Sequence, residues 1–338
     1  MIFAHLSPDP LAAVDAALAG AADGIAVATS GSTGAPRVVR VPAAAVRASA
    51  SATAARLGEA GWLLAIPADR IGGAMVVARA RLADAPLSTL PPGRFTADAF
   101  AAAASSLPDG PHHVSLVPTQ LRRLLAEPAG REALARFEAV LVGGAALPDA
   151  ELPPGVVSTY GMSETSGGCV YDGRPLDGVE VAIGPDGRIR VAGPTLAAGY
   201  ADGDDAAFET NAGRRWFVTS DLGELRDGVL TVLGRADHVI NTGGVKVHPL
   251  PVERALEAVP GVEACAVVGV PDTQWGERVV AVLAGAVDDA ALASAISALP
   301  GPSRPRRIVR VGDVPRTAGG KIDRAAARSL AAPQEEIR

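Results

Sequence analysis

Short apolar runs alternate with alanine-rich stretches along the first half of the chain. The runs Gly24–Ser30, Trp62–Pro67 and Glu138–Leu147 are short and apolar, which predicts buried strands. Ala43–Leu57 has the composition and length of a helix, and His112–Glu127 predicts a strand, a break at a proline and then a helix. Strands that alternate with helices favour crossover connections and therefore a largely parallel sheet.

The pattern changes after Tyr171. Two segments, Val179–Gly193 and Gly213–Arg235, alternate apolar and polar residues on both sides of an Asp-Gly pair. This arrangement is typical of a β-hairpin. We therefore expect a β-rich module that closes the first domain.

Beyond Arg235 the chain returns to mixed helices and strands. The predicted helices are Leu250–Val259 and Asp289–Leu299, and the predicted strands are Glu263–Val270 and Arg278–Gly285. A chain of 338 residues is longer than one hydrophobic core usually organises. The fold class expected is α/β: a large domain of parallel or mixed sheets with helices over residues 1–236, and a small α+β domain over residues 237–338.

Composition narrows the classes of function. The formal net charge is −6, which argues against a general binder of nucleic acid or of an anionic membrane. No apolar run is long enough to span a bilayer, and the first residues lack the features of a signal peptide, so we expect a cytoplasmic protein. Cys169 and Cys265 lack metal-ligand spacing, and two buried thiols are expected rather than one disulfide.

The first candidate for chemistry is the loop after the first apolar run. Its small and hydroxyl-bearing residues could wrap phosphate oxygens with successive backbone N–H groups. The spacing differs from that of a Walker P-loop. A hairpin or linker rich in serine and glycine would look the same. The candidate phosphate-binding residues are Ser30, Gly31, Ser32, Thr33 and Gly34.

Two further loops follow predicted strands. The pair Gly143–Gly144, followed by Ala145, would let a flat ring lie against backbone, although a simple turn would have the same residues. The segment Ser158–Gly168 offers an aromatic ring at Tyr160 and then a hydroxyl and a carboxylate. Ring, hydroxyl and acid suit adenine stacking, phosphate contact and Mg²⁺ ligation, and the alternative is a surface loop anchored by a tyrosine.

Three more signals lie further along the chain. Asp221, at the end of a predicted strand, could accept both hydroxyls of a ribose or could simply begin a turn. Only two of the 31 basic residues are lysines, Lys246 and Lys321, and both lie close to a Gly-Gly pair. A lysine is ordinarily a solvated surface cation, so their rarity in an arginine-rich chain is what singles them out.

Taken in order, these motifs resemble those of the adenylate-forming superfamily of acyl- and aryl-CoA synthetases. The resemblance runs from about Ala28 to Arg324. Within the superfamily, the segments Ser115–Leu125, Ser158–Val181 and Gly234–Pro249 look like the short actinobacterial ligases that join o-succinylbenzoate to CoA in menaquinone synthesis. The resemblance implies an ATP-dependent, Mg²⁺-dependent acid–CoA ligase with an acyl-adenylate intermediate. Its partners would be an aryl carboxylic acid, ATP and CoA, and family habit suggests a homodimer.

The resemblance also implies a role for each residue. The loop Ser30–Gly34 would hold the β- and γ-phosphates, and Lys321 would act in the adenylation step. The other implied roles are adenine and ribose contacts for Gly143, Gly144, Ala145, Tyr160, Asp221 and Arg235, phosphate contact for Ser163, Mg²⁺ ligation for Glu164, a hinge at Asp237, a CoA loop of Gly243, Gly244 and Lys246, and an acyl pocket of Arg70, Pro118, Thr119, Gly161, Ser166 and Gly168.

Chemistry gives a reason for the rare lysine at 321. A carboxylate that attacks the α-phosphate of ATP brings two anions together, so a cation must suppress their repulsion. A compact ammonium on a flexible stem can bridge two oxygens, whereas a planar guanidinium is larger and has fixed donor directions. We therefore expect Lys321 to be the cation of the first half-reaction.

The chain departs from the family pattern at three places. Arg37 stands where the phosphate loop commonly ends in lysine, and we expect little change because the charge is kept. The chain begins close to this loop, so the large domain would be abbreviated. Asp69 and Arg70 replace an expected histidine pair: Arg70 could pair with a distal substrate carboxylate, or form a surface salt bridge with Asp69. Another aryl or dicarboxylic acid is therefore an alternative substrate.

Two rival functions share these residues. An adenylation enzyme that loads a carrier-protein thiol would use the same first step, but no carrier domain is recognisable among these 338 residues, so we expect CoA to be the acceptor. A non-catalytic nucleotide-binding protein would not need Glu164, Asp221 and Lys321 together.

Overall fold

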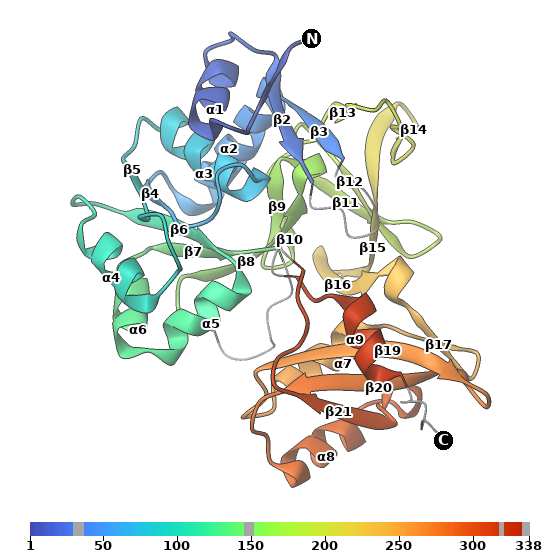
Figure 1. Cartoon of the computed structure of the whole chain (residues 1–338). Coiled ribbons are helices and arrows are strands. Elements are labelled where there is room, and N and C mark those ends of the chain that lie inside the picture. The colour runs from blue at the N-terminus through green and yellow to red at the C-terminus, as the bar shows by residue number, and fades with distance from the viewer. Residues whose placement is uncertain (30–36, 145–151, 318–320, 333–338) are drawn as a thin grey trace.

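The computed structural model describes residues 1–29, 37–144, 152–317 and 321–332, which form four β-sheets (Figure 1). The largest sheet has seven strands in the order β10-β9-β8-β7-β6-β4-β5. Its strands are β4 (Gly61–Leu64), β5 (Leu87–Thr89), β6 (His112–Leu116), β7 (Ala139–Val142), β8 (Val156–Met162), β9 (Gly167–Tyr171) and β10 (Arg174–Pro175). Strands β5, β4, β6, β7 and β8 pair with one another in parallel, so the predicted parallel sheet is confirmed for five of the seven strands. Strand β9 pairs antiparallel with β8, and β10 pairs antiparallel with β9.

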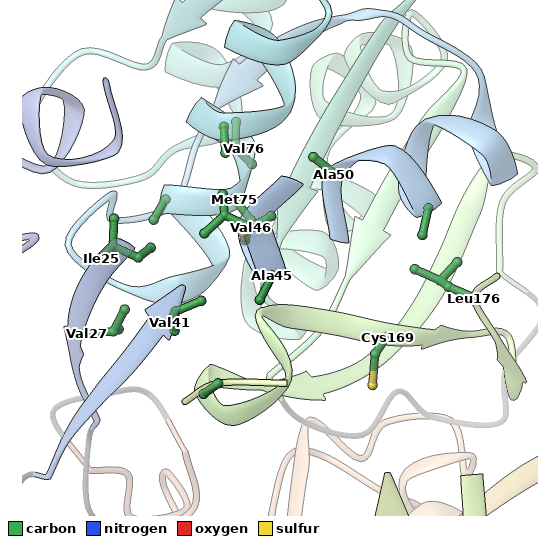
Figure 2. Packing of buried hydrophobic residues seen from close by; sticks show 14 of the residues in the cluster. Ile25, Val27, Val41, Ala45, Val46, Ala50, Met75, Val76, Cys169 and Leu176 are labelled. Atoms are coloured by element: carbon green, nitrogen blue, oxygen red, sulfur yellow. The ribbon is translucent and has the colours of Figure 1, made fainter. Parts of the chain in front are cut away.

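Helices cover both faces of this sheet. One core contains residues of α2 and α3 together with a small four-stranded sheet, and Figure 2 shows Ala45, Val46, Met75 and Val76 of these helices in that core. A second core lies under the helices of the opposite face. The helices are α1 (Pro10–Leu18), α2 (Ala43–Leu57), α3 (Ile71–Leu82), α4 (Ala97–Ser105), α5 (Pro118–Ala126) and α6 (Pro128–Leu134), and the small sheet is β1 (Phe3–His5), β2 (Gly24–Ala28), β3 (Val38–Pro42) and β13 (Gly199–Tyr200).

The predicted β-rich module is confirmed as a five-stranded antiparallel sheet. Both predicted hairpins are present, β11 with β12 and β15 with β16. The strands are β11 (Glu180–Ile183), β12 (Arg188–Ala192), β14 (Phe208–Asn211), β15 (Arg214–Arg226) and β16 (Val229–Arg235). After Arg235 a short turn of 3₁₀ helix, Ala236–His238, carries the chain out of this sheet.

The last third of the described chain forms a sheet covered on both faces. Alternate residues of β19 enter opposite cores: Cys265 and Val267 face α7 and α8, whereas Ala266 and Val268 face α9. Because both faces are apolar, the strands read as continuous apolar runs. The elements are β17 (Ile240–Thr242), β18 (Val245–Val247), α7 (Pro249–Glu257), β19 (Ala264–Asp272), β20 (Gly276–Ala284), α8 (Asp289–Ala298), β21 (Arg307–Val311) and α9 (Arg324–Ala331).

This sheet begins at Ile240, a few residues after the antiparallel sheet ends at Arg235. The boundary at Asp237 falls in that interval and stays a prediction. In this structure the two parts touch, since Arg122 of α5 donates a hydrogen bond of 3.0 Å to the Glu263 carbonyl oxygen.

The sequence pattern did not predict α3. Nearly the whole helix is buried, so it lacks the polar face that makes a helical period visible. It also contains Gly73, where a Cβ would lie 2.2 Å from the Pro67 carbonyl oxygen, so the tight entry of the helix requires glycine.

Both cysteines are free and buried, as expected, and burial raises the pKa of the Cys169 thiol to about 12. Among the residues described, none of the helices has the length and apolar character required to traverse a lipid bilayer.

Candidate active site

Three predicted nucleotide-binding residues meet where the large sheet approaches the antiparallel sheet. The Tyr160 hydroxyl on β8 donates a hydrogen bond of 2.9 Å to Asp221 Oδ2 on β15. Asp221 lies opposite Arg235 in the β15–β16 ladder. The Asp221 backbone N–H donates to Thr219 Oγ1 at 3.0 Å, which fixes the bend that presents the carboxylate. Tyr160 thus shares one site with Asp221 and Arg235, which lie 61 and 75 positions further along the chain.

Burial and charge act in opposite directions on this carboxylate. Burial raises the pKa of Asp221, while the Tyr160 hydrogen bond and the charges of Arg235 and Lys321 pull it back. Burial, and then the charge of Asp221, raise the pKa of Tyr160 well above its ordinary value. Tyr160 therefore stays protonated at neutral pH and acts as a donor to Asp221.

Lys321 lies in the C-terminal part of the chain and is exposed. It is close enough for its charge to lower the pKa of Asp221, which lies one hundred positions earlier. Its backbone carbonyl accepts a hydrogen bond of 2.8 Å from Thr317 N–H, and Arg316 and Ile322 form a bridge on either side. Residues 318–320 lie outside the described part, so the position of Lys321 is described from these backbone contacts of Arg316, Thr317 and Ile322.

A buried ion pair anchors the segment that follows Lys321. The Arg324 guanidinium donates to both oxygens of Glu253, at 2.6 and 2.8 Å, and to the Val267 carbonyl at 2.9 Å. Glu253 is 3% exposed and also accepts 2.7 Å from Val267 N–H. Sequence reasoning missed this pair because Glu253 and Arg324 are 71 positions apart. Their arrangement fixes one end of the Lys321 loop to α7 and β19.

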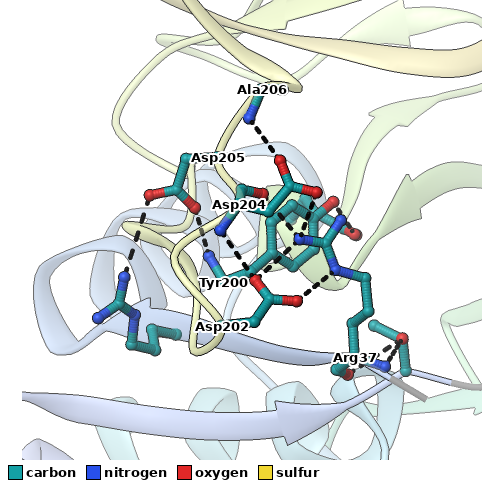
Figure 3. Close-up of polar contacts among 9 residues, drawn as sticks. Arg37, Tyr200, Asp202, Asp204, Asp205 and Ala206 are labelled. Carbon is teal, nitrogen blue, oxygen red and sulfur yellow. Dashed lines mark hydrogen bonds and ion pairs between the residues drawn. The ribbon is translucent and has the colours of Figure 1, made fainter. Parts of the chain in front are cut away.

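The predicted magnesium ligand, Glu164, belongs to a second polar cluster, of which Figure 3 labels Arg37, Tyr200 and Asp202. The Tyr200 hydroxyl donates a hydrogen bond of 2.9 Å to Glu164 Oε1, and the Arg37 guanidinium lies 3.6 Å from the centre of the Tyr200 ring. Arg37 also donates to both carboxylate oxygens of Asp202, at 3.0 and 2.9 Å. Glu164 is thereby linked to the residue that follows the predicted phosphate loop.

Arg37 uses properties that lysine lacks. Its fork binds Asp202 through two parallel hydrogen bonds while its flat face stacks on Tyr200. The hydrogen bonds that Arg37 donates to Asp202 raise the pKa of Arg37. The expectation that only charge matters at this position stays a prediction, but the contacts give the arginine a structural task of its own.

Magnesium would fit at Glu164 only with help from a substrate. Among the described residues no three His, Cys, Asp or Glu side chains gather in a metal-binding cluster. Mg²⁺ commonly takes one or two carboxylates and completes its shell with phosphates and water. A single carboxylate facing a nucleotide therefore suits the ion. Ser163, the residue before Glu164, starts the 3₁₀ turn Ser163–Thr165.

The predicted hinge residue, Asp237, forms an ion pair with Arg235. Arg235 Nε and Nη2 donate to the two oxygens of Asp237 at 2.9 and 2.8 Å, and this bonding lowers the pKa of Asp237. The pair joins the last residue of β16 to the turn that leads into the next sheet. A hinge role for Asp237 stays a prediction.

Each Gly-Gly pair has a local geometric reason. A Cβ on Gly143 would lie 2.5 Å from Thr159 Oγ1, and Gly144 has a φ of 85°. Gly243 and Gly244, with φ of 56° and 79°, form the two-residue turn between β17 and β18, which requires positive φ at both positions. Lys246 follows on β18 and is exposed. The proposed contacts of these residues with adenine or CoA stay predictions.

The predicted acyl-pocket residues are spread over several elements. Gly161 and Gly168 are partners across β8 and β9, whereas Pro118 and Thr119 begin α5. Ser166 is 0% exposed and its hydroxyl donates 2.7 Å to the Thr195 carbonyl, so that hydroxyl is engaged by backbone.

Arg70 forms the salt bridge foreseen as its alternative. Its Nε lies 3.7 Å from Asp69 Oδ2, and Nη1 donates 3.3 Å to the Ala28 carbonyl at the end of β2. Both side chains are about half exposed, so the pair contributes little to stability. Ser30, Gly31, Ser32, Thr33, Gly34 and Ala145 lie outside the described residues.

Two family models match the chain. The AMP-binding enzyme family matches residues 25–201, and the AMP-binding enzyme C-terminal domain matches residues 251–321. The two matches together include β8 with Tyr160 and the segment that ends at Lys321.

Individual relatives agree with these matches. The chain is 44% identical over 321 residues to a probable 2-succinylbenzoate–CoA ligase of Mycobacterium tuberculosis, covering 89% of this chain and 83% of that one. It is 32% identical to a sulfoacetate–CoA ligase of Cupriavidus necator, over 88% of this chain and 65% of that one. Among solved structures, o-succinylbenzoate CoA synthetase from Bacillus subtilis in complex with an acyl-adenylate intermediate superposes with a TM-score of 0.76 at 26% identity, covering 90% of this chain and 68% of that one.

Asp221→Asn should make the protein more stable and weaken nucleotide binding. A carboxyl whose pKa is raised on folding contributes stability below its unfolded pKa, and that contribution is lost as pH rises through the folded pKa. At neutral pH the buried ionised form is therefore a cost, which asparagine removes while still accepting from Tyr160. We expect a higher unfolding midpoint in denaturant at neutral pH and at least about tenfold weaker ATP binding by calorimetry.

The gain in stability should shrink as pH falls toward the unfolded pKa of the carboxyl. Asp227→Asn, at the exposed tip of the same hairpin, is the matched control and should leave both measurements unchanged. A destabilised Asp221→Asn protein at neutral pH would contradict the assignment.

Arg37→Lys should weaken the Glu164 cluster although it keeps the charge. Lysine loses the fork to Asp202 and the stacking on Tyr200. We expect the apparent KM for ATP to rise about fivefold. Arg40→Lys is the control, because Arg40 meets Asp205 only at 4.0 Å, a contact that a point charge reproduces. Equal KM values for the two variants would refute a role for the fork.

Proposed function

Because the chain belongs to the AMP-binding enzyme family, we propose that it is an ATP-dependent acid–CoA ligase acting on 2-succinylbenzoate. The reaction converts 2-succinylbenzoate, ATP and CoA into the CoA thioester, AMP and pyrophosphate through an acyl-adenylate. The likeness to the Mycobacterium tuberculosis ligase supports the choice of acid, and the Bacillus subtilis structure with its acyl-adenylate supports the intermediate.

One observation carries the proposal. The Asp221 carboxylate accepts a hydrogen bond from Tyr160 of the large sheet, and the charges of Arg235 and of Lys321, in the C-terminal part, lower its pKa. A ribose acceptor, an aromatic ring and a nearby cation suit a nucleotide whose α-phosphate must react. A protein that only bound nucleotide would not need the ammonium.

In the first half-reaction a substrate carboxylate oxygen attacks the α-phosphorus of ATP. The bond from that phosphorus to the bridging oxygen breaks, and pyrophosphate leaves. Asp221 would hold the ribose hydroxyls and Tyr160 would lie against the adenine, while Lys321 bridges the attacking carboxylate and the α-phosphate oxygens. Its charge suppresses the repulsion between the two anions as they approach.

Glu164 would hold Mg²⁺, which would neutralise charge on the phosphates when bound. The hydrogen bond from Tyr200 to Glu164 Oε1 orients this carboxylate, and Arg37 fixes the tyrosine ring from its other side. Tyr200 and Arg37 would thus orient the Glu164 carboxylate before a nucleotide binds.

In the second half-reaction the CoA thiolate attacks the acyl carbon and AMP leaves. We infer that the C-terminal part turns about Asp237 between the two steps, withdrawing Lys321 and presenting the Gly243–Gly244 turn. Such an exchange lets one site serve two reactions. The Arg235–Asp237 pair would then have to change, since it spans the predicted pivot.

The choice of acid is tested by a panel. Pyrophosphate release should be fastest with 2-succinylbenzoate and much slower with benzoate, succinate or sulfoacetate, the last included because of the Cupriavidus necator relative. Mass spectrometry with free CoA should detect the thioester, which separates this function from carrier-protein loading. Release with another acid of the panel alone would overturn the substrate but keep the reaction class.

The two lysines should divide the half-reactions between them. Lys321→Ala should lower the rate of pyrophosphate release by about 10²- to 10³-fold, because the transition state loses its cation. Supplied acyl-adenylate and CoA should still give thioester at the normal rate. Lys246→Ala should show the reverse: normal pyrophosphate release and slower thioester formation. Equal loss of both half-reactions in Lys321→Ala would contradict its role.

A further inference from the structure

A small cavity lies between the C-terminal ends of α2 and α3, at the amino end of β4. Its volume is about 80 Å³. Buried side chains of Thr53, Trp62 and Arg79 form its floor, and the exposed residues Ser51, Gly58 and Glu59 form its rim. Gly143 and Gly144 follow the carboxyl end of the parallel strand β7, whereas this cavity lies at the amino end of β4, so the two lie at opposite ends of the parallel strands.

Arg79 is a buried cation without an acidic partner. It is 7% exposed, and its Nε is buried with no hydrogen-bond partner. Its contacts within the described residues are a long hydrogen bond of 3.4 Å to the Tyr171 hydroxyl and a face contact with Trp62, 5.2 Å from the ring centre. The rim carboxylate of Glu59 does not come within the 4.0 Å of an ion pair.

Neither contact neutralises the guanidinium. An aromatic face and a hydroxyl solvate a cation weakly, and a buried charge without a counter-ion opposes folding. His113 adds no further charge to this region: burial, and then the charge of Arg79, lower the pKa of His113 to about 4, so His113 is neutral at physiological pH. The floor of the cavity therefore carries one uncompensated positive charge.

We propose that this cavity binds a small oxyanion, a phosphate or carboxylate group, with the Arg79 guanidinium as its charged partner. Arg79 lines the cavity, and its planar guanidinium has the fork geometry that suits such groups. The exposed rim residue Ser51 adds a hydroxyl, and the open mouth lets a group on a larger molecule enter. Glu59 opposes the anion and sets the affinity.

The test follows the Arg79 Nε–H signal by nitrogen-proton NMR of the full chain. Inorganic phosphate and succinate are titrated separately at constant ionic strength. Because phosphate also enters a nucleotide site, the local signal is needed rather than total binding. We expect a saturable shift of this signal, kept in Arg81→Gln, whose arginine lies on the same helix but pairs with Asp15 at the surface.

Two variants keep Arg79 and therefore do not depend on its tolerance to mutation. Glu59→Gln should tighten binding about two- to fivefold, because a like charge is removed from the rim. Ala54→Leu should weaken it at least about tenfold by filling the cavity. Saturation by phosphate alone or by succinate alone supports the site and identifies its ligand. No saturable shift with either ion, or a shift that both variants leave unchanged, overturns the proposal.

Discussion

The placement of one buried carboxylate, Asp221, is the constraint on which the site depends. Burial opposes its ionised form. That form is stabilised by a hydrogen bond from Tyr160 of the large sheet and by the positive charges of Arg235 and Lys321. Among the described residues Asp221 forms no ion pair, so its carboxylate can accept further hydrogen bonds from a substrate. Its environment is therefore set by three parts of the chain, and any motion of the C-terminal part changes it.

The polar pairs around the site share a second property: each ties a loop to a rigid element. Arg37 fixes the strand after the predicted phosphate loop to the Asp202 turn, and Arg324 fixes the segment after Lys321 to Glu253 on α7. The two pairs thus hold Arg37 and Arg324, which follow the two predicted catalytic segments, in fixed positions.

Much of the fold followed from pattern, and much of the site's geometry did not. Ala43–Leu57 was predicted as a helix to its exact bounds, because alanine-rich composition and flanking breaks act locally. α3 was missed because eight consecutive residues, Gly73 to Ala80, are buried and leave no polar face along that stretch. Residue types at Tyr160, Asp221 and Lys321 suggested chemistry, but their meeting depends on packing across three sheets. The Glu253–Arg324 and Arg37–Tyr200 contacts carry no local signal at all.

The uneven use of lysine and arginine has a physical basis in these contacts. Arginines at 37, 235 and 324 act through fork geometry that binds a carboxylate with two hydrogen bonds and so holds a fixed structure. In the described part of the chain neither lysine ammonium is held by a hydrogen bond or an ion pair, and Lys321 acts on Asp221 only through its charge. In the proposed mechanism Lys321 crosses to the substrate and then withdraws, and a cation with that task cannot be tied to a permanent partner. Under this proposal, the residue type that is rare in this chain is the one suited to a cation that moves.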